Sequence, residues 1–111
     1  MYKIIFVTKR KPGLTLGQYL EHYRTTHFQL AIKMPGLVSY RQMPIRHEGP
    51  WSDQAPDYDA VSEYVFDSDE AAEASWASAE GQAIQEDTGK FIDWPSVIYL
   101  PVSLAQEWIR P

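Results

Sequence analysis

The 111-residue sequence contains no cysteine, and its 10 lysine and arginine residues are outnumbered by 15 aspartate and glutamate residues, for a formal net charge of −5. Without cysteine, a chain has no disulfide, no thiolate nucleophile and no cysteine-based metal site. With so few basic residues, it has no patch that could neutralise a run of phosphates, so neither nucleic acid nor an anionic membrane surface is an expected partner. The absence of cysteine also fits a cytoplasmic location.

Several motifs of enzymes and membrane proteins are missing as well. No apolar run approaches the roughly 18 residues of a membrane-spanning helix, and no signal-peptide pattern precedes the strand-like KIIFV at the N-terminus. Zinc motifs of the HExxH or HxxxH type, the GxSxG nucleophile motif and glycine-rich phosphate loops are absent too. His22 and His27 lie about 140° apart around an α-helix, so they are not expected to bind one metal ion together. The sequence therefore predicts no metal site, no cofactor and no covalent nucleophile.

What the sequence does contain is 44% hydrophobic and 14% aromatic residues, enough to bury the core of one domain spanning residues 1–111. Alternating or β-branched runs predict strands, and apolar residues three or four apart predict helices. The expected elements are strands at 2–9, 37–46, 58–66 and 96–102, a helix at 15–36, and an alanine-rich helical segment after 67–70. This order predicts an α+β, ferredoxin-like βαββαβ fold, with a four-stranded antiparallel sheet and the helices on one face.

Such a sheet leaves its second face uncovered in a monomer. Strand alternation places Val61 and Val65 on that face, and the C-terminal tail carries Leu104, Trp108 and Ile109, apolar residues that usually bury against something. We therefore expect a homodimer in which two subunits stack their sheets about a twofold axis, as in a dimeric α+β barrel.

The most informative stretch is the helix between Thr15 and Gly36. Thr15 has a side-chain oxygen suited to an N-cap, and Pro35-Gly36 ends the helix. Leucine, tyrosine and methionine side chains form an apolar stripe about 100° wide; His27 lies inside it, whereas His22 falls on the solvent side. Two interpretations of His27 follow: a core histidine bonded to a backbone carbonyl, or a proton-transfer residue beside a cavity.

Two further segments have recognisable patterns. Residues 48–57, EGPWSDQAPD, contain two prolines and a glycine and predict an irregular loop. With Trp51 and the neighbouring His47, this loop is either a lid over a ligand or a mobile hairpin connection. Residues 67–70 have the pattern of a capping box that opens the second helix, and Gly81 is expected to break that helix into two pieces.

Strand alternation also assigns side chains to the two faces of the sheet. On the second strand, Tyr40 is expected to share a face with Val38. On the third strand, Glu63 has the opposite parity to Tyr64, so we expect Glu63 on the face away from the helices.

Four stretches resemble the EthD-type proteins: KRKPGLT after the first strand, YRTTHFQLAIKMPGLVSYRQ through the helix exit, DAVSEYVFDSDEA at the third strand, and SAEGQAIQEDTGKFID in the later helical region. The tightest part of the resemblance is a histidine followed eight and nine residues later by Pro-Gly. HFQ followed by MPGL, with a tyrosine three residues after Leu37, is particularly similar to the methylmuconolactone methylisomerases. The resemblance covers nearly the whole chain and implies the dimeric α+β barrel fold.

The same resemblance implies a site. In the lactone isomerases the matching histidine and tyrosine line the pocket between helices and sheet, so His27 and Tyr40 carry over directly. The pocket cysteine of those enzymes aligns with Tyr64, a departure that still allows proton transfer without a thiol. Their loop histidine has an approximate counterpart in His47.

In this context His27 is expected to be a general acid or base. Tyr40 and Tyr64 would donate hydrogen bonds to a substrate carbonyl and to the enolate or phenolate that forms. The residues expected to bind the ring of a substrate are Phe6, His47, Trp51, Trp76 and Phe91.

The resemblance therefore implies a cofactor-independent isomerase, lyase or cyclase. Such an enzyme would act by proton transfer on a small hydrophobic cyclic or aromatic carbonyl compound, such as a lactone, phenol or polyketide-like ring, in a catabolic or biosynthetic pathway. Two alternatives stay open: a small-ligand-binding accessory protein of a catabolic cluster, without turnover, and a monooxygenase of the same superfold.

Overall fold

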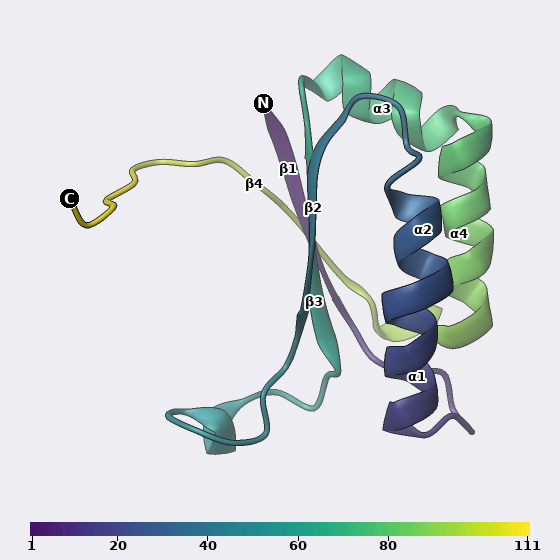
Figure 1. Ribbon diagram of the computed structural model, residues 1–111, viewed down its shortest axis with the longest axis vertical. Helices are drawn as coiled ribbons and strands as arrows, with labels where there is room; N and C mark the ends of the chain where they lie inside the picture. Colours follow the sequence, from purple (N-terminus) through teal and green to yellow (C-terminus); the bar gives the residue numbers. More distant parts are fainter.

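A four-stranded antiparallel sheet forms one layer of the structure, a computed structural model that describes residues 1–111. Its strands are β1 (Tyr2–Thr8), β2 (Leu37–Pro44), β3 (Ala60–Phe66) and β4 (Ile98–Val102), and they lie side by side in the order β2-β3-β1-β4. The helices all cover one face of this sheet (Figure 1). The α+β, ferredoxin-like fold expected from the sequence is therefore confirmed.

The helical layer consists of two antiparallel arms. The first arm runs through α1 (Leu16–His22), a π-helical turn η1 (Tyr23–His27) and α2 (Phe28–Ala31). The second arm contains α3 (Asp69–Ala77) and α4 (Ala79–Phe91), and α4 lies beside α2 (Figure 1). Two short 3₁₀ turns, η2 (Ser52–Gln54) and η3 (Trp94–Ser96), lie in the connections to β3 and β4.

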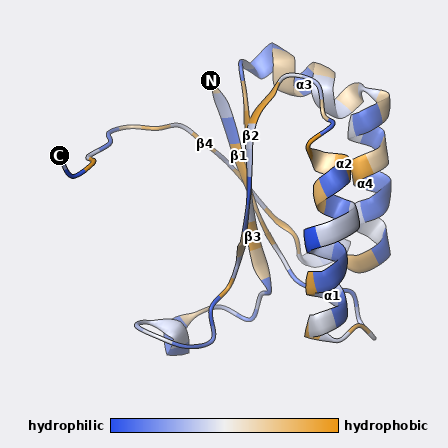
Figure 2. Ribbon diagram, viewed as in Figure 1, coloured by the Kyte–Doolittle hydropathy of each residue, from blue (hydrophilic) through white to orange (hydrophobic).

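The hydrophobic core fills the space between the two layers. On α2, hydrophobic residues surround the single hydrophilic Gln29, and Ala31 is fully buried (Figure 2). The buried core residues form two clusters: Ile4, Ala31, Met34, Tyr64, Phe66, Ala72 and Ile84 in one, and Tyr19, Tyr23, Ala60, Phe91 and Ile92 in the other.

The ends of the first helical arm agree with the sequence prediction. The Thr15 hydroxyl accepts a hydrogen bond from the Gln18 amide, and the Gln18 side chain accepts one from the Thr15 amide, which completes a capping box. Gly36 has a φ of 75°, a conformation that glycine adopts without steric cost, and the chain leaves the helix there.

The second helical arm corrects two predictions. The N-cap of α3 is Ser68, whose hydroxyl accepts from the Ala71 amide, so the capping motif begins one residue later than expected. The break between α3 and α4 falls at Ser78, which caps α4, and not at Gly81. Gly81 instead lets the two helices approach closely, because a Cβ at this position would collide with the carbonyl oxygen of Ser75.

The start of β2 corrects a third prediction. A β-bulge between Leu37 and Ser39 adds an extra residue at Val38. Leu37 therefore pairs with Phe66 and contacts the core, while Val38 is exposed and does not share the face of Tyr40.

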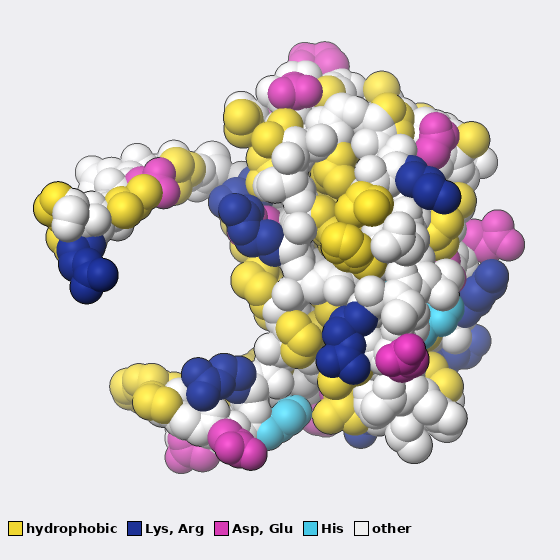
Figure 3. Space-filling view, viewed as in Figure 1, with side chains coloured by type: hydrophobic (Ala, Val, Ile, Leu, Met, Phe, Trp, Pro, Cys, Tyr) yellow, Lys and Arg dark blue, Asp and Glu magenta, His cyan; other side chains and the backbone are white.

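The second face of the sheet carries no helix (Figure 1). Glu63 lies on this face, as expected, and forms ion pairs with Lys3 and Arg41. The tail, residues 103–111, is exposed throughout and extends away from the sheet, with Trp108 79% exposed. The tail and the β2–β3 loop, residues 45–59, project from the same side and leave a hollow between them (Figure 3). None of the helices is both long enough and apolar enough to cross a lipid bilayer.

Candidate active site

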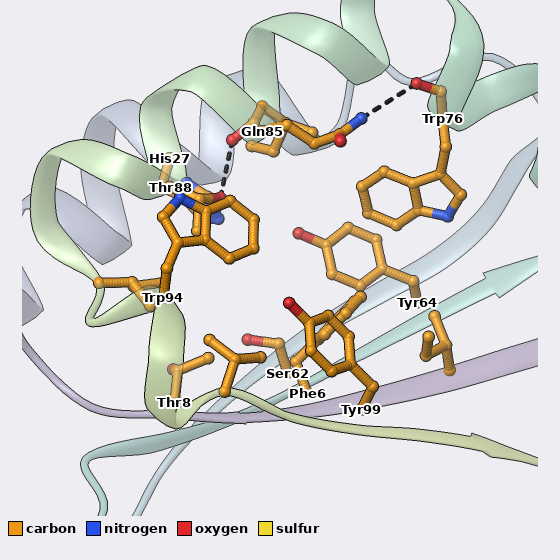
Figure 4. Close-up of a pocket in the computed structure, with 14 residues that line it drawn as sticks. Phe6, Thr8, His27, Ser62, Tyr64, Trp76, Gln85, Thr88, Trp94 and Tyr99 are labelled. Atoms are coloured by element: carbon orange, nitrogen blue, oxygen red, sulfur yellow. Dashed lines mark hydrogen bonds between the residues drawn. The ribbon is translucent and has the colours of Figure 1, made fainter.

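A cavity of about 260 Å³ lies between the sheet and the helices (Figure 4). Its floor comes from the helix-facing side chains of β1, β3 and β4, and its walls come from η1, α3, α4 and the segment around η3. The lining residues are Ile4, Phe6, Thr8, His27, Ser62, Tyr64, Trp76, Ile84, Gln85, Thr88, Ile92, Trp94, Val97 and Tyr99. Aromatic and aliphatic surface therefore surrounds a small number of polar groups, as in pockets that bind small organic molecules.

His27 is the one histidine that lines this cavity. Its Nδ1 atom lies 2.9 Å from Oδ2 of Asp87, a carboxylate on α4 that is only 2% exposed. The two residues are 60 positions apart in the chain, so this bond also joins the two helical arms. Of the two interpretations of His27, the core histidine bonded to a backbone carbonyl is wrong, because its partner is a carboxylate.

The hydrogen bond to Asp87 determines the tautomer of His27. An ionised carboxylate can only accept hydrogen bonds, so Nδ1 of His27 carries the proton and donates it. The neutral ring then has an unprotonated Nε2 atom. Nε2 has no hydrogen-bond partner in the protein, and it is not among the buried polar atoms sealed from solvent. A lone pair on Nε2 is thus available to a molecule in the cavity.

His22 shares the same carboxylate, which corrects its predicted place on the solvent side. Its Nε2 atom lies 2.9 Å from Oδ1 and 3.0 Å from Oδ2 of Asp87, and its side chain is 28% exposed. The physical reason is η1: the wider π-helical turn, with its i→i+5 hydrogen bonds, brings residues five apart closer to the same side, whereas an α-helix separates them by about 140°. No group of three or more histidine, cysteine, aspartate or glutamate side chains is placed to hold a metal ion.

Burial and Asp87 act on the pKa of His27 in opposite directions. Burial lowers the pKa below its ordinary value because the charged imidazolium loses water, and this effect is the largest. The hydrogen bond and negative charge of Asp87 raise the pKa, the charge of the nearby His22 lowers it by a smaller amount, and the net result is a pKa below the ordinary value. His27 is therefore unprotonated near neutral pH and can accept a proton.

Tyr64 lies on β3, in the floor of the cavity, and directs its hydroxyl group into it (Figure 4). Burial raises the pKa of Tyr64 well above its ordinary value, and the nearby Tyr40 raises it further. The phenol therefore keeps its proton and can donate a hydrogen bond to an oxygen atom in the cavity.

Tyr40 lies one layer behind Tyr64 and does not line the cavity. The two rings are 4.6 Å apart between centroids, and the Tyr40 hydroxyl accepts a hydrogen bond from Nε2 of Gln42 at 2.8 Å. Burial raises the pKa of Tyr40 to about 12, so this phenol is neutral as well. Contrary to the prediction, Tyr40 acts on a molecule in the cavity only indirectly, through the hydroxyl groups of Tyr64 and Ser62, which lie next to its own and line the cavity.

The residues predicted to bind a ring fall into three positions. Phe6 and Trp76 line the cavity, and their rings meet edge-on with centroids 5.9 Å apart. Phe91 is buried behind it, with its ring centroid 4.8 Å from that of His27. Trp51, 82% exposed, and the exposed His47 lie in the β2–β3 loop, outside the cavity. The loop projects from the helix-free side of the sheet, so neither residue covers this cavity (Figure 1).

Several residues of the site were not identified from the sequence, among them Asp87, Thr88, Trp94 and Tyr99. Asp87 and Thr88 lie between Ile84 and Phe91 at helical spacing, so a carboxylate within an apolar stripe was a signal comparable to His27. Tyr99 pairs directly with Phe6 across β1 and β4, and strand alternation alone could have placed it on the cavity face.

The family model described as EthD domain matches residues 11–95 of the chain. This range contains His22, His27, Asp87 and Tyr64. A comparison with curated proteins found no match.

Solved structures show the same architecture. An EthD family protein from Bacillus halodurans superposes with a TM-score of 0.75 at 21% identity, over 94% of this chain and 99% of that one. A dimeric ferredoxin-like protein of unknown function from Thermobifida fusca has a TM-score of 0.72 at 14% identity, over 93% and 90% of the two chains. A mutant of SnoaB, a cofactor-independent oxygenase from Streptomyces nogalater, has a TM-score of 0.62 at 13% identity, over 95% of each. At these identities the likeness shows the fold.

Proposed function

This chain belongs to the EthD family, and we propose that it is a cofactor-independent isomerase, lyase or cyclase that moves a proton on a small cyclic or aromatic carbonyl compound. One observation carries the proposal: a buried histidine is held by a carboxylate at Nδ1 and presents an unprotonated Nε2 to an apolar cavity. A positioned base of this kind typically contributes a factor of about 10²–10⁴ to a rate.

The proposed reaction begins with His27. Its Nε2 atom takes a proton from the carbon next to the substrate carbonyl, and the C–H electron pair moves into a C=C bond as the carbonyl oxygen becomes an enolate oxygen. Tyr64 donates a hydrogen bond to that oxygen, where the charge develops. Asp87 offsets the positive charge that forms on His27. The imidazolium then returns the proton to a different carbon, for isomerisation, or to a leaving group, for elimination.

The lining of the cavity supports a ring-shaped substrate. Phe6, Trp76 and Tyr99 present aromatic surface, with the ring centroids of Trp76 and Tyr99 each within 6 Å of that of Phe6. A volume of about 260 Å³ accommodates one or two fused rings. The apolar surroundings also weaken competition from water for the hydrogen bond of Tyr64.

We also propose that the active form is a homodimer. On the helix-free face, Ile98, Leu100 and Val102 of β4 are exposed, and the tail presents Leu104, Trp108 and Ile109. The exposed apolar side chains of β4, together with those of the tail, suit a twofold contact between copies. The Thermobifida fusca protein of similar fold is described as dimeric.

A turnover screen tests the catalytic proposal. Purified protein would be incubated with methylmuconolactones, hydroxylated anthrones and related cyclic ketones, and the products separated by chromatography. We expect at least one compound to be converted, and His27→Ala to lower kcat by about 10²–10⁴-fold. His47→Ala is the matched control, because His47 is exposed and outside the cavity, and it should keep the native rate.

Binding without product formation in this screen would instead favour a ligand-binding accessory protein. The similarity in fold to the cofactor-independent oxygenase SnoaB favours a second enzymatic candidate, an oxygenase acting on an activated aromatic ring. An oxygen electrode separates the two reactions, because substrate-dependent oxygen uptake supports the oxygenase and its absence during turnover supports proton transfer.

A further inference from the structure

Asp87 is a buried carboxylate whose side chain has two hydrogen-bond partners, His22 and His27. The oxygen that accepts from His27, Oδ2, also lies 3.0 Å from Nε2 of His22, and the other oxygen, Oδ1, lies 2.9 Å from the same atom. His22 therefore engages both oxygens, whereas His27 engages one. The orientation of the carboxylate plane depends on His22.

The ring of His22 is itself held in place. Its centroid lies 4.5 Å from that of Phe91, and the Phe91 ring in turn lies 4.8 Å from His27. The Phe91 ring thus packs against both imidazole rings, and the Asp87 carboxylate is hydrogen-bonded to both. Because η1 brings residues five apart into line, the two histidines approach Asp87 from adjacent turns of one helical arm.

A carboxylate with one buried partner would be free to turn or to recruit water. Leaving a buried acceptor without its partner is costly, so the carboxylate would reorient toward any available donor. Either change would weaken the bond to Nδ1 of His27 and allow the other tautomer, in which Nε2 carries the proton and cannot accept one.

We propose that His22 is a positioning residue: by donating its Nε2 proton to both oxygens of Asp87, it keeps the carboxylate in the orientation that leaves Nε2 of His27 free toward the cavity. The role of His22 in catalysis rests on the proposed function of His27. The structural part, control of the His27 tautomer through Asp87, does not require turnover.

The test compares His22→Leu with His22→Gln. The amide nitrogen of glutamine can occupy the place of the imidazole Nε2 and donate to Asp87, whereas leucine cannot donate. Nitrogen-15 NMR of histidine-labelled protein at about pH 8, where imidazoles are mostly neutral, reports the protonated nitrogen of each ring. We expect native-like signals for His27 in His22→Gln and a mixture of tautomers in His22→Leu. With a substrate, kcat of His22→Leu should fall about tenfold, with KM changed by less than about threefold.

Glu21→Gln is the control, because Glu21 is the exposed neighbour on α1 and has no hydrogen bond from its side chain. Should His22→Leu fail to fold, as judged by circular dichroism, His22→Asn replaces it: asparagine is polar but too short to reach Asp87, and it should behave as described for leucine. Unchanged His27 signals in His22→Leu, or in His22→Asn where it replaces His22→Leu, would overturn the proposal. If no compound is turned over, the proposed function fails while the NMR comparison still decides the role of His22.

Discussion

The pKa of His27 results from opposing effects of its surroundings. Burial of the ring lowers its pKa, and Asp87 raises it through a hydrogen bond and a negative charge. The result is a neutral imidazole whose free nitrogen faces an apolar cavity. A histidine in this state accepts protons at neutral pH and is stabilised by the carboxylate once it is charged.

The pH dependence of activity follows from this balance. Protonation of Nε2 removes the base, and burial places the pKa of His27 below its ordinary value of about 6.5, so kcat/KM should fall only below that pH. In Asp87→Asn the interactions that raise this pKa are lost, and the acidic limb should move to lower pH, with kcat reduced by about tenfold or more because the tautomer is no longer determined. The measurement is a kcat/KM profile between about pH 4 and 9. An acidic limb that moves to higher pH in Asp87→Asn would contradict the assignment.

Tyr64 and Tyr40 should respond differently to loss of their hydroxyl groups. Tyr64 lines the cavity, and Tyr64→Phe is expected to lower kcat by about a hundredfold, the usual cost of losing a donor to a developing oxyanion. Tyr40→Phe removes the acceptor for Gln42 and a hydrogen-bonding neighbour of the Tyr64 hydroxyl, but no group that lines the cavity, so its effect on kcat should be about tenfold smaller. Steady-state kinetics of the two variants measure the loss of kcat in each. Equal losses would place both hydroxyls on the substrate.

At the scale of elements, the π-helical turn η1 is the feature on which the site depends. Thr15 begins the helical arm with a capping box, and Gly36 ends it, so the arm is held at both ends. Between them, η1 changes the rotation per residue and brings His22 and His27 to the same side. The other helical arm supplies Asp87, and its position depends in turn on how closely α3 and α4 approach.

The substitution Gly81→Ala tests how much the fold depends on the close approach of α3 and α4. In Gly81→Ala the new Cβ would collide with the carbonyl oxygen of Ser75 and lie 2.7 Å from Cα of Trp76, both backbone atoms that cannot move independently. We expect the free energy of unfolding to fall by about 1–3 kcal/mol, as for overpacking in other cores. Urea denaturation followed by circular dichroism measures this change.

Gly17→Ala is the matched control for Gly81→Ala. Gly17 lies in α1, and a Cβ there would meet only Oγ1 of Thr15 at 3.9 Å. Because alanine favours helices more than glycine, this variant should gain up to about 1 kcal/mol. A loss of stability in both variants would indicate a general effect of the substitution instead of a collision at Gly81.

At the scale of the whole molecule, the two faces of the sheet differ: the candidate site lies on one face, and the other face carries no helix. The helices and the cavity occupy one side, while the β2–β3 loop and the tail project from the other (Figures 1 and 3). The apolar residues of the tail, Leu104, Trp108 and Ile109, are exposed in a single copy. Their apolar character is explained if they contact a second copy.

Removal of the tail tests the homodimer. A chain that ends at Ser103 should form a dimer with a dissociation constant raised about tenfold or more, because apolar anchors such as Trp108 often supply much of the binding energy of an interface. Trp108→Ala should show part of this effect, and Glu107→Ala, in the same exposed tail, should show little. Sedimentation equilibrium measures the constants. A native chain that is monomeric at about 100 μM, far above the Kd of a stable dimer, would contradict the proposal.

The sequence by itself determined the features that depend on neighbours along the chain. Strand alternation placed Tyr64 on the helix-facing side and Glu63 on the other, because successive side chains in a strand point to opposite faces. The start and end of the first helical arm followed from Thr15 and Gly36, since caps involve residues only a few positions apart.

Tertiary structure decided the rest of the site. The bond between His27 and Asp87 spans 60 positions, and no local pattern couples residues at that distance. The place of His22 depended on η1, because helical angles predicted with 3.6 residues per turn fail where the turn is wider. The loop with His47 and Trp51 has the composition of a lid, but the direction in which β2 and β3 end places it on the far side of the sheet. Residue types thus indicated which groups could do chemistry, and the packing of the two helical arms determined which of them meet.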